Sequence, residues 1–200
     1  MTTPLAEPAV IVGLGNPGQR YEKTRHNAGF LLLDFACSKL GITPRWQERD
    51  GYWCADLTVG THRVFFIKPQ TYMNQSGEPL QSFLNFRKLN INNLVVCHDE
   101  LDLALGAVRF KYGGGDGGHN GLKSIATHCG GTEYIRLRLG IGRPEIPPGA
   151  DKHAITSNWV LSNINADPST LSSMLGRGFD ALALLLDLGF QEAQNRTNRG

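Results

Sequence analysis

Short apolar runs alternate with helical patterns along most of this chain, and this alternation restricts the fold more than any other feature. Runs such as AVIV (9–12) and LVVC (94–97) are continuous and short, which is typical of buried strands. Segments such as 24–40 instead repeat their apolar residues on one helical side and stop at a glycine, here Gly41. The pattern predicts one α/β domain over residues 1–200, with a twisted, mixed and mostly parallel central sheet and helices on both of its faces.

The same two patterns predict the remaining elements. We expect a hairpin over 52–69 that turns at Gly60, because two strand-like runs flank that glycine. Further expected elements are a turn and helix at 70–89, strands at 108–113 and 133–144, and helices at 121–131 and 166–190. The polar tail from about residue 191 is expected to be frayed.

The stretch GLGNPG (13–18) follows the first strand and spells the G-x-G-x-x-G of dinucleotide-binding turns. Such a turn opens a helix whose amides face the pyrophosphate, and an acidic residue follows about 20 residues later at the end of the next strand. Here the polar segment QRYEKTRHN follows instead, Pro17 removes a backbone N–H, and Asp34, at that spacing, lies in a helical pattern. A nicotinamide-dependent oxidoreductase is therefore the less favoured alternative.

Composition excludes several other classes. No apolar run is long enough to span a bilayer, and the start MTTPLAEP lacks the basic and hydrophobic regions of a secretory signal, so we expect a cytoplasmic protein. Neither the four cysteines nor the six histidines show metal-ligand spacing, so no metal or other cofactor is expected. Cys97 lies in an apolar run, where cysteines are typically inert.

The net charge of +2 is unevenly distributed. Residues 105–145 contain six basic and three acidic residues, a net charge of +3, whereas the remainder contains 14 basic and 15 acidic residues, a net charge of −1. Such segregation suits a phosphate-rich partner. Within EYIRLRLG (133–140) the side chains alternate, so with the leucines in the core both Arg136 and Arg138 are expected to face outward.

Polar residues that follow the expected strands indicate where chemistry can occur, because open α/β sheets bind ligands beyond the carboxyl ends of their strands. Asn16, Asn74 and Asp99 follow strands, Asn120 starts a helix, and His26 lies in a first helical turn. A helix N-terminus favours the neutral form of His26, while Asp99 would fix its tautomer and stabilise the imidazolium. Because no nucleophile elbow is present, we expect His26 to activate a water that attacks an ester, with the asparagine amides positioning the water and the carbonyl.

Four motifs make the hydrolase interpretation specific: GLGNPGQRYEKTRHNAGF, KPQTYMNQSGEPL, VCHDELDLALGAVRFKYGGGDGGHNGLKSI and YIRLRLGIGRP. In this order, over about residues 9–145, they strongly resemble the bacterial-type peptidyl-tRNA hydrolase family. The resemblance implies a cytoplasmic, monomeric enzyme without a metal that cleaves the ester between a peptide and tRNA, so that the tRNA returns to translation. It is weaker over 142–160, where a lid over the active site is expected.

The resemblance also implies roles for individual residues. It makes His26 the catalytic base, Asp99 the residue that orients it, and Asn120 the residue that positions the water and supports the oxyanion. The expected partner is peptidyl-tRNA, bound through its acceptor stem, its terminal adenosine and its peptide. The residues expected to bind it are Asn16 and Tyr21 near the tRNA end, Tyr72, Met73 and Asn74 on the peptide side, His119 beside the site, and Lys111 and Arg138 at the 5′-phosphate.

A second alternative is an RNA-binding module without enzymatic activity, because relatives of this family in plant organelles act in intron splicing. The presence of His26, Asp99 and the three asparagines favours the enzyme. Release of peptide from a peptidyl-tRNA would distinguish the two.

Overall fold

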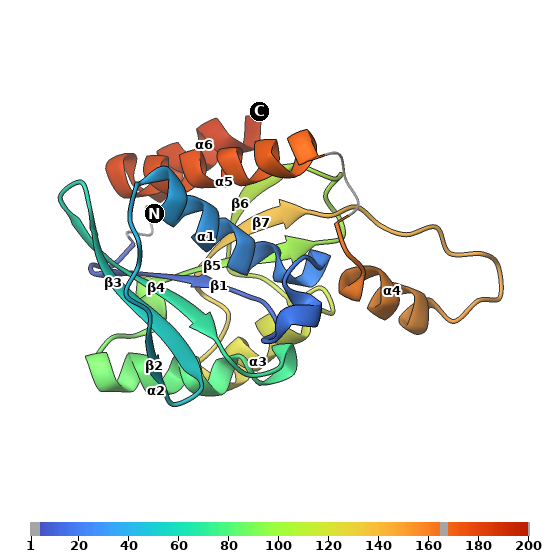
Figure 1. The fold of residues 1–200 in the computed structure, drawn as a ribbon, viewed down its shortest axis with the longest axis horizontal. Coiled ribbons are helices and arrows are strands. Elements are labelled where there is room, and N and C mark those ends of the chain that lie inside the picture. The colour runs from blue at the N-terminus through green and yellow to red at the C-terminus, as the bar shows by residue number, and fades with distance from the viewer. Residues whose placement is uncertain (1–4, 165–167, 200) are drawn as a thin grey trace.

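The computed structural model describes residues 5–164 and 168–199, and its centre is a seven-stranded sheet in the order β2-β3-β4-β1-β5-β7-β6 (Figure 1). Strands β4, β1, β5 and β7 run parallel, while β2, β3 and β6 pair antiparallel with their neighbours. The predicted mixed, mostly parallel sheet is confirmed. The strands are β1 (Ala9–Gly13), β2 (Gln47–Arg49), β3 (Tyr52–Val59), β4 (His62–Pro69), β5 (Leu94–Glu100), β6 (Val108–Tyr112) and β7 (Ile135–Gly140).

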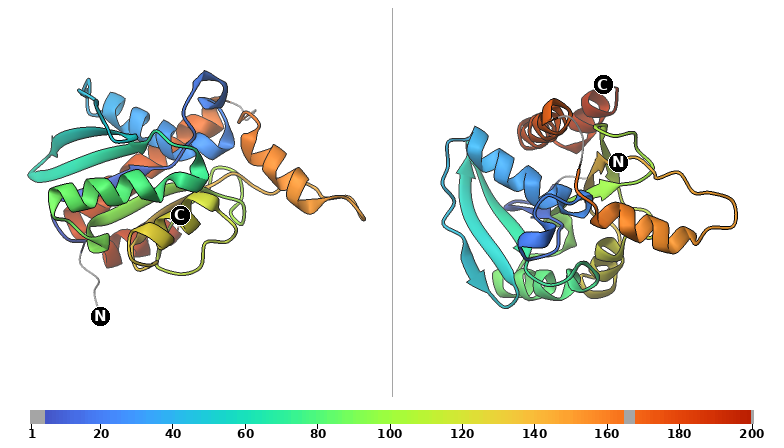
Figure 2. Two further views of the ribbon diagram at one scale, coloured as in Figure 1. Left: turned by 90° about the horizontal axis from the view of Figure 1, so that it is seen from below. Right: turned by 45° about the vertical axis from the view of Figure 1, so that its right-hand side comes forward.

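Helices cover both faces of the sheet. Helices α1, α5 and α6 lie on one face and α2 and α3 on the other, whereas α4 stands away from both layers, beyond the carboxyl ends of the parallel strands (Figures 1 and 2). The helices are α1 (Ala28–Lys39), α2 (Gly77–Arg87), α3 (Asn120–His128), α4 (Lys152–Leu161), α5 (Pro168–Leu188) and α6 (Phe190–Arg199). Among the described residues, none of the helices has the length and hydrophobicity that crossing a membrane requires.

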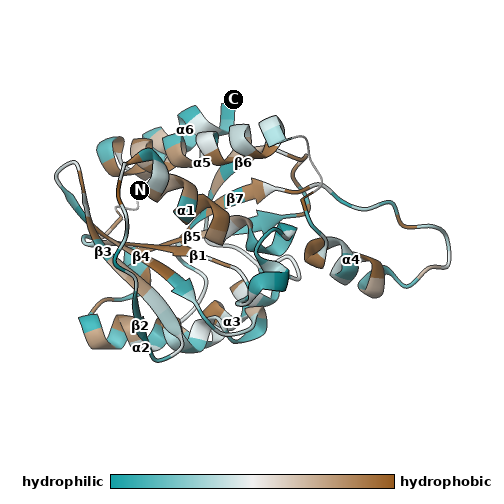
Figure 3. Ribbon diagram, viewed as in Figure 1, coloured by the Kyte–Doolittle hydropathy of each residue, from teal (hydrophilic) through white to brown (hydrophobic). Residues whose placement is uncertain are grey.

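The core is divided by the sheet into two apolar layers, which the hydropathy colouring shows as brown strands between brown helix faces (Figure 3). Alternate residues of β5 take part in different layers: Val95 packs with Leu32 of α1, and Val96 with Phe83 of α2. Burying a side chain of this size stabilises the fold by roughly 1.5–3 kcal/mol. The continuous apolar runs of the sequence therefore reflect strands that are buried on both faces.

Close packing of α1 against the sheet explains the first two glycines of GLGNPG, Gly13 and Gly15. A Cβ atom on Gly13 would lie 2.5 Å from the carbonyl oxygen of Gly29, and one on Gly29 would lie 2.3 Å from the carbonyl oxygen of Cys97. A Cβ on Gly15 would lie within 2.7 Å of the Phe30 ring. These contacts show that the start of α1 touches the end of β1 and the middle of β5. A short 3-10 turn at 19–21, rather than a helix, follows the glycines.

The structure corrects two predictions about helix ends. The helix expected from Thr24 begins with a 3-10 turn, Arg25–Asn27, and becomes α-helical at Ala28, since the Thr24 hydroxyl donates to the Tyr21 carbonyl instead of capping. The tail expected to fray from about residue 191 is helix α6, so that prediction was wrong. Asn198 explains the order, because its side-chain amide both accepts from the N–H of Phe110 (2.8 Å) and donates to its carbonyl (3.0 Å) on the edge strand β6.

Candidate active site

A cavity of about 430 Å³ lies beyond the carboxyl ends of β1 and β5. Its walls come from the loops after β1, β4 and β5, from the loop before α3, and from one side of α4. The residues predicted for the site that line it are Asn16, His26, Met73, Asn74, Asp99, His119 and Asn120. Asn16, His26, Asn74, Asp99 and Asn120, which the strand-edge argument grouped together, are therefore neighbours in space, whereas Met73 and His119 were expected only from the family resemblance.

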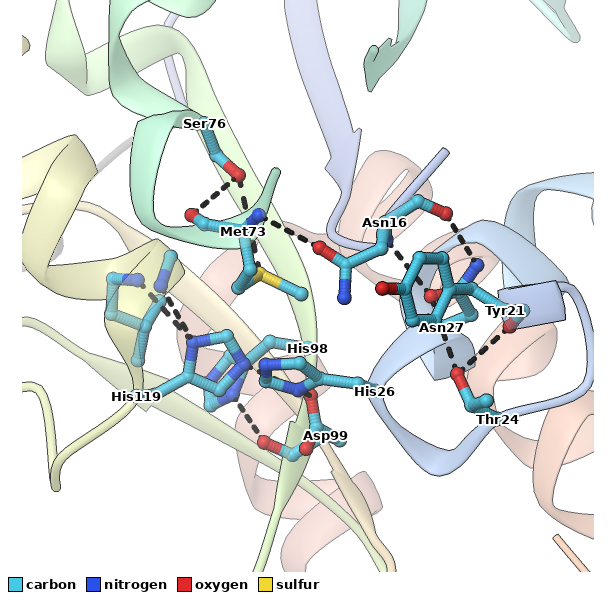
Figure 4. Close-up of polar contacts among 12 residues, drawn as sticks. Asn16, Tyr21, Thr24, His26, Asn27, Met73, Ser76, His98, Asp99 and His119 are labelled. Atoms are coloured by element: carbon cyan, nitrogen blue, oxygen red, sulfur yellow. Dashed lines mark hydrogen bonds and ion pairs between the residues drawn. The ribbon is translucent and has the colours of Figure 1, made fainter. Parts of the chain in front are cut away.

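A buried carboxylate joins two histidines at the floor of this cavity (Figure 4). Asp99, 3% exposed, accepts from Nδ1 of His26 and from Nε2 of His119 on the same oxygen, Oδ1, at 2.9 Å each. Nδ1 of His119 accepts from the backbone N–H groups of Gly121 (3.1 Å) and Leu122 (3.4 Å), so its proton is on Nε2. Because Nδ1 of His26 donates to the carboxylate, Nε2 is its basic nitrogen.

The electrostatics of the pair follow from this geometry. Burial alone would raise the pKa of Asp99, but the two histidines outweigh it and hold that pKa well below its usual range. Burial alone would lower the pKa of His26, but the charge and hydrogen bond of Asp99 prevail and raise it. Asp99 is thus an anion that stabilises the imidazolium of His26. Burial raises the pKa of the Cys97 thiol, in agreement with its predicted inertness.

Analysis of the sequence missed His98, a buried residue that also lines the cavity. Its Nδ1 donates to the backbone carbonyl of Asp99 (2.8 Å), and its ring meets that of His119 edge-on with centroids 5.1 Å apart. Burial, and then the neighbouring His119, lower the pKa of His98 to about 3, so it stays neutral. The alternation of side chains along β5 could have predicted that His98 and Asp99 point to opposite faces of the strand. The contact of His98 with His119 could not be predicted in this way, because it joins two segments that are distant in the sequence.

Asn16 ties two loops together (Figure 4). Its Oδ1 accepts from the backbone N–H of Met73 (2.8 Å). Its backbone N–H and carbonyl exchange hydrogen bonds with the side chain of Asn27, at 2.9 and 3.0 Å. The loops after β1 and β4 are therefore fixed to one another, and only the Nδ2 group of Asn16 is left for a ligand. Asn74 and Asn120 are exposed on the cavity wall and make no side-chain hydrogen bond within the described residues.

Four of the predicted binding residues lie outside the cavity. Tyr72 is 54% exposed, and Tyr21 carries a guanidinium over its ring, that of Arg20, at 4.5 Å from the centroid. Lys111 is exposed on β6, with no ion pair within the part of the chain that the structure describes. Arg138 on β7 is half-buried, and its Nε donates to Oε2 of Glu100 at 2.9 Å.

Arg136 points away from the leucines of β7, as the alternation predicts, but it does not reach the surface. It is 2% exposed, and its guanidinium donates to the backbone carbonyls of Gly114 and Gly115. The alternation itself holds, because Leu137 and Leu139 are in the core. The face that carries the arginines is covered by the loop that precedes α3, so an outward side chain is still a buried one.

Helix α4 forms the outer wall of the cavity and is fastened at one end. The guanidinium of Arg25 stacks on Trp159 at 3.8 Å from the ring centroid and donates to Ser162 Oγ (2.5 Å) and to the carbonyl of Asn163 (2.6 Å). None of the residues of α4 itself is buried. This helix, which the sequence patterns did not predict, is therefore held by the residue next to His26.

His26, Asp99 and His119 also have the chemistry of metal ligands, with donor atoms within 4.8 Å of one another. A histidine ligand presents a lone pair to the metal. Nε2 of His119 carries a proton instead, because backbone N–H groups occupy Nδ1. The three residues fit a hydrogen-bonded chain better than a metal centre.

The fold and the site together define the class of protein. It is an α/β protein in which a buried carboxylate binds two histidines beside a cavity at the carboxyl ends of the parallel strands. A family model described as "Peptidyl-tRNA hydrolase" matches residues 10–200. The peptidyl-tRNA hydrolase of Mycobacterium marinum is 39% identical, over 97% of this chain and 99% of its own length. That of Geobacter sp. strain M21 is 42% identical, over 94% and 97%.

Solved structures agree with these relatives. The crystal structure of peptidyl-tRNA hydrolase from Acinetobacter baumannii is similar with a TM-score of 0.82 and 36% identity, covering 99% of this chain and 96% of that one. The chain belongs to the peptidyl-tRNA hydrolase family. The prediction of this family and of its enzyme class from the four motifs is confirmed.

Proposed function

We propose that this chain hydrolyses the ester between a peptide and the terminal ribose of tRNA, with His26 as general base. The contact that carries the proposal is the 2.9 Å hydrogen bond from His26 Nδ1 to Asp99 beside the cavity. A water attacks the ester carbonyl and gives its proton to Nε2 of His26. The imidazolium, stabilised by Asp99, then protonates the ribose oxygen as the ester bond breaks, giving a peptide carboxylic acid and tRNA with a free hydroxyl.

The asparagines provide amides that do not titrate near neutral pH. Asn120, exposed on the cavity wall beside His119, would orient the water and donate to the developing oxyanion. Asn74, next to Met73 in the wall, is available to the peptide backbone. Asn16 would contact the tRNA end through Nδ2 alone, since Met73 already occupies its Oδ1.

The tRNA body would lie along β6 and β7, where Lys111 and Arg138 reach the 5′-phosphate. A phosphate at Arg138 would meet the carboxylate of Glu100, which accepts from Nε of the same guanidinium at 2.9 Å. Tyr21 and Tyr72, outside the cavity, would contact the terminal nucleotide and the peptide as these enter. A cytoplasmic location, a monomeric state and independence from metals and cofactors remain predictions.

Turnover of N-acetylated aminoacyl-tRNA tests the proposal. The acylated substrate should be cleaved far faster than the free aminoacyl-tRNA, whose ammonium is costly to desolvate in the cavity. The His26→Ala variant should lose about a hundredfold or more in kcat while it still binds tRNA. Near-normal kcat in that variant would refute the mechanism, and binding without any peptide release by the native chain would favour the RNA-binding module.

A further inference from the structure

The loop that leads into α3 consists almost entirely of glycine. Residues 113–118, here called the glycine loop, are five glycines and Asp116. Four of those glycines adopt positive φ, between 58° and 95°. Glycine loses more conformational freedom on folding than any other residue, so a loop of this kind needs contacts from outside to hold one shape.

Arg136 supplies the outside contact. Its Nη1 donates to the carbonyl of Gly115 at 2.7 Å, and its Nη2 to that of Gly114 at 2.5 Å. The guanidinium lies 4.9 Å from the centroid of the Tyr134 ring, and the residue is 2% exposed. No carboxylate pairs with it among the described residues, so two carbonyl oxygens are the partners of its Nη1 and Nη2 groups, while its buried Nε has no hydrogen-bond partner among those residues. The planar fork of a guanidinium suits two successive carbonyls, and no other side chain offers it.

The second half of the glycine loop connects Arg136 to the active site through hydrogen bonds. Asp116 Oδ1 accepts from the N–H of Gly118 (2.7 Å), and the Asp116 carbonyl accepts from the N–H of His119 (2.9 Å). His119 then donates to Asp99 at 2.9 Å, and Asn120 follows it in the chain. The contacts thus run without a break from the guanidinium to the carboxylate that orients His26.

We propose that Arg136 is a positioning residue for the reaction, a role that rests on the proposed hydrolase function. It fixes the glycine loop in the shape that places His119 against Asp99 and Asn120 at the cavity wall. It does not bind tRNA phosphate, because the glycine loop covers it, whereas Lys111 is exposed and Arg138 is half-buried.

The test uses Arg136→Lys and Arg136→Gln in the full chain. Arg109→Gln is the matched control, since Arg109 lies on the adjacent strand and also donates to backbone carbonyls, of Val108 and Thr197, but away from the glycine loop. For each variant, kcat and KM are measured on N-acetylated aminoacyl-tRNA and on a short N-acetylated aminoacyl ester of adenosine. Hydrogen exchange is followed by mass spectrometry over 113–120 and over 94–100.

We expect both Arg136 variants to lose about tenfold or more in kcat on both substrates, the size of effect that misplaced catalytic groups produce. KM for the tRNA substrate should change less than kcat, exchange over 113–120 should accelerate, and exchange over 94–100 should not. Lysine should fail to rescue although it keeps the charge, and Arg109→Gln should behave like the native chain.

Three results would overturn the proposal. A raised KM for the tRNA substrate with normal cleavage of the short ester would make Arg136 a phosphate ligand. Faster exchange in 94–100 as well as 113–120 would make it a general stabiliser of the sheet. Unchanged exchange over 113–120 would show that the glycine loop is ordered without it. If the native chain cleaves neither substrate, the hydrolase function fails, while the exchange data still decide whether Arg136 orders the loop.

Discussion

Gly29→Ala should separate α1 from the sheet by about an ångström. The new methyl would lie 2.3 Å from the Cys97 carbonyl oxygen and 2.4 Å from the Leu14 nitrogen, where ordinary contact begins at 3.4 Å. It would also wedge apart the hydrogen bond that these two groups make at 3.0 Å. Overpacking of this kind costs roughly 1–3 kcal/mol, against at most about 1 kcal/mol gained by alanine in a helix. We expect a net loss of about 1–2 kcal/mol in the free energy of unfolding.

The same displacement should reduce turnover, because His26 lies three residues before Gly29. A shift of about 1 Å lengthens the 2.9 Å contact with Asp99 beyond hydrogen-bond distance, and misplacement of that size can cost about a hundredfold in rate. Urea unfolding and kcat on N-acetylated aminoacyl-tRNA measure the two effects. Gly176→Ala is the control, since its Cβ would meet only Phe35 Cζ, at 4.0 Å, and should stabilise α5 by roughly 0.5–1 kcal/mol. Native stability and native kcat in Gly29→Ala would refute the argument.

Three further predictions concern charge. Asp99→Asn removes the anion that raises the pKa of His26, so kcat should fall about tenfold or more and its decline in acid should move to lower pH, as a kcat–pH profile would show. Burial lowers the pKa of His98 from its ordinary 6.5 to about 3, so between these values the folded protein binds fewer protons than the unfolded chain. The free energy of unfolding should therefore fall as the pH drops from 6.5 towards 4. Urea titrations should show that this free energy depends less on pH in the His98→Gln variant. Glu100→Gln frees Arg138 and should tighten tRNA binding and steepen its salt dependence by up to about one unit of log–log slope; an unchanged Kd would place the phosphate elsewhere.

The sequence predicted those parts of the molecule that depend on local pattern. Parallel strands are buried on both faces, so continuous apolar runs such as AVIV predict them. Residues at the carboxyl ends of such strands, Asn16 and Asp99 among them, lie at one edge of the sheet. Helix α4 has no buried residue and β2 is three exposed residues, so neither shows an apolar period. The order of the C-terminal tail depends on Asn198 and Phe110, which are 88 positions apart.

Side chains that depend on the packing of distant segments were the hardest to foresee. The burial of Arg136 depends on a glycine loop that contributes almost no side chains and hence no hydrophobic pattern. The contact of Arg25 with Trp159 joins two segments 134 positions apart, and each residue alone is typical of a surface. Pattern indicates the direction of a side chain, but not what the rest of the chain places over it.

Because Arg25 holds α4 near its C-terminal end, any movement of that helix would pivot next to His26. Ten residues at 1.5 Å each give an arm of about 15 Å. A swing of roughly 10° would therefore move the far end of α4 by about 2.6 Å, while the pivot at Ser162 stays close to its place. A swing of α4 alone would change the width of the cavity mouth and would leave the 2.9 Å contact between His26 and Asp99 unchanged.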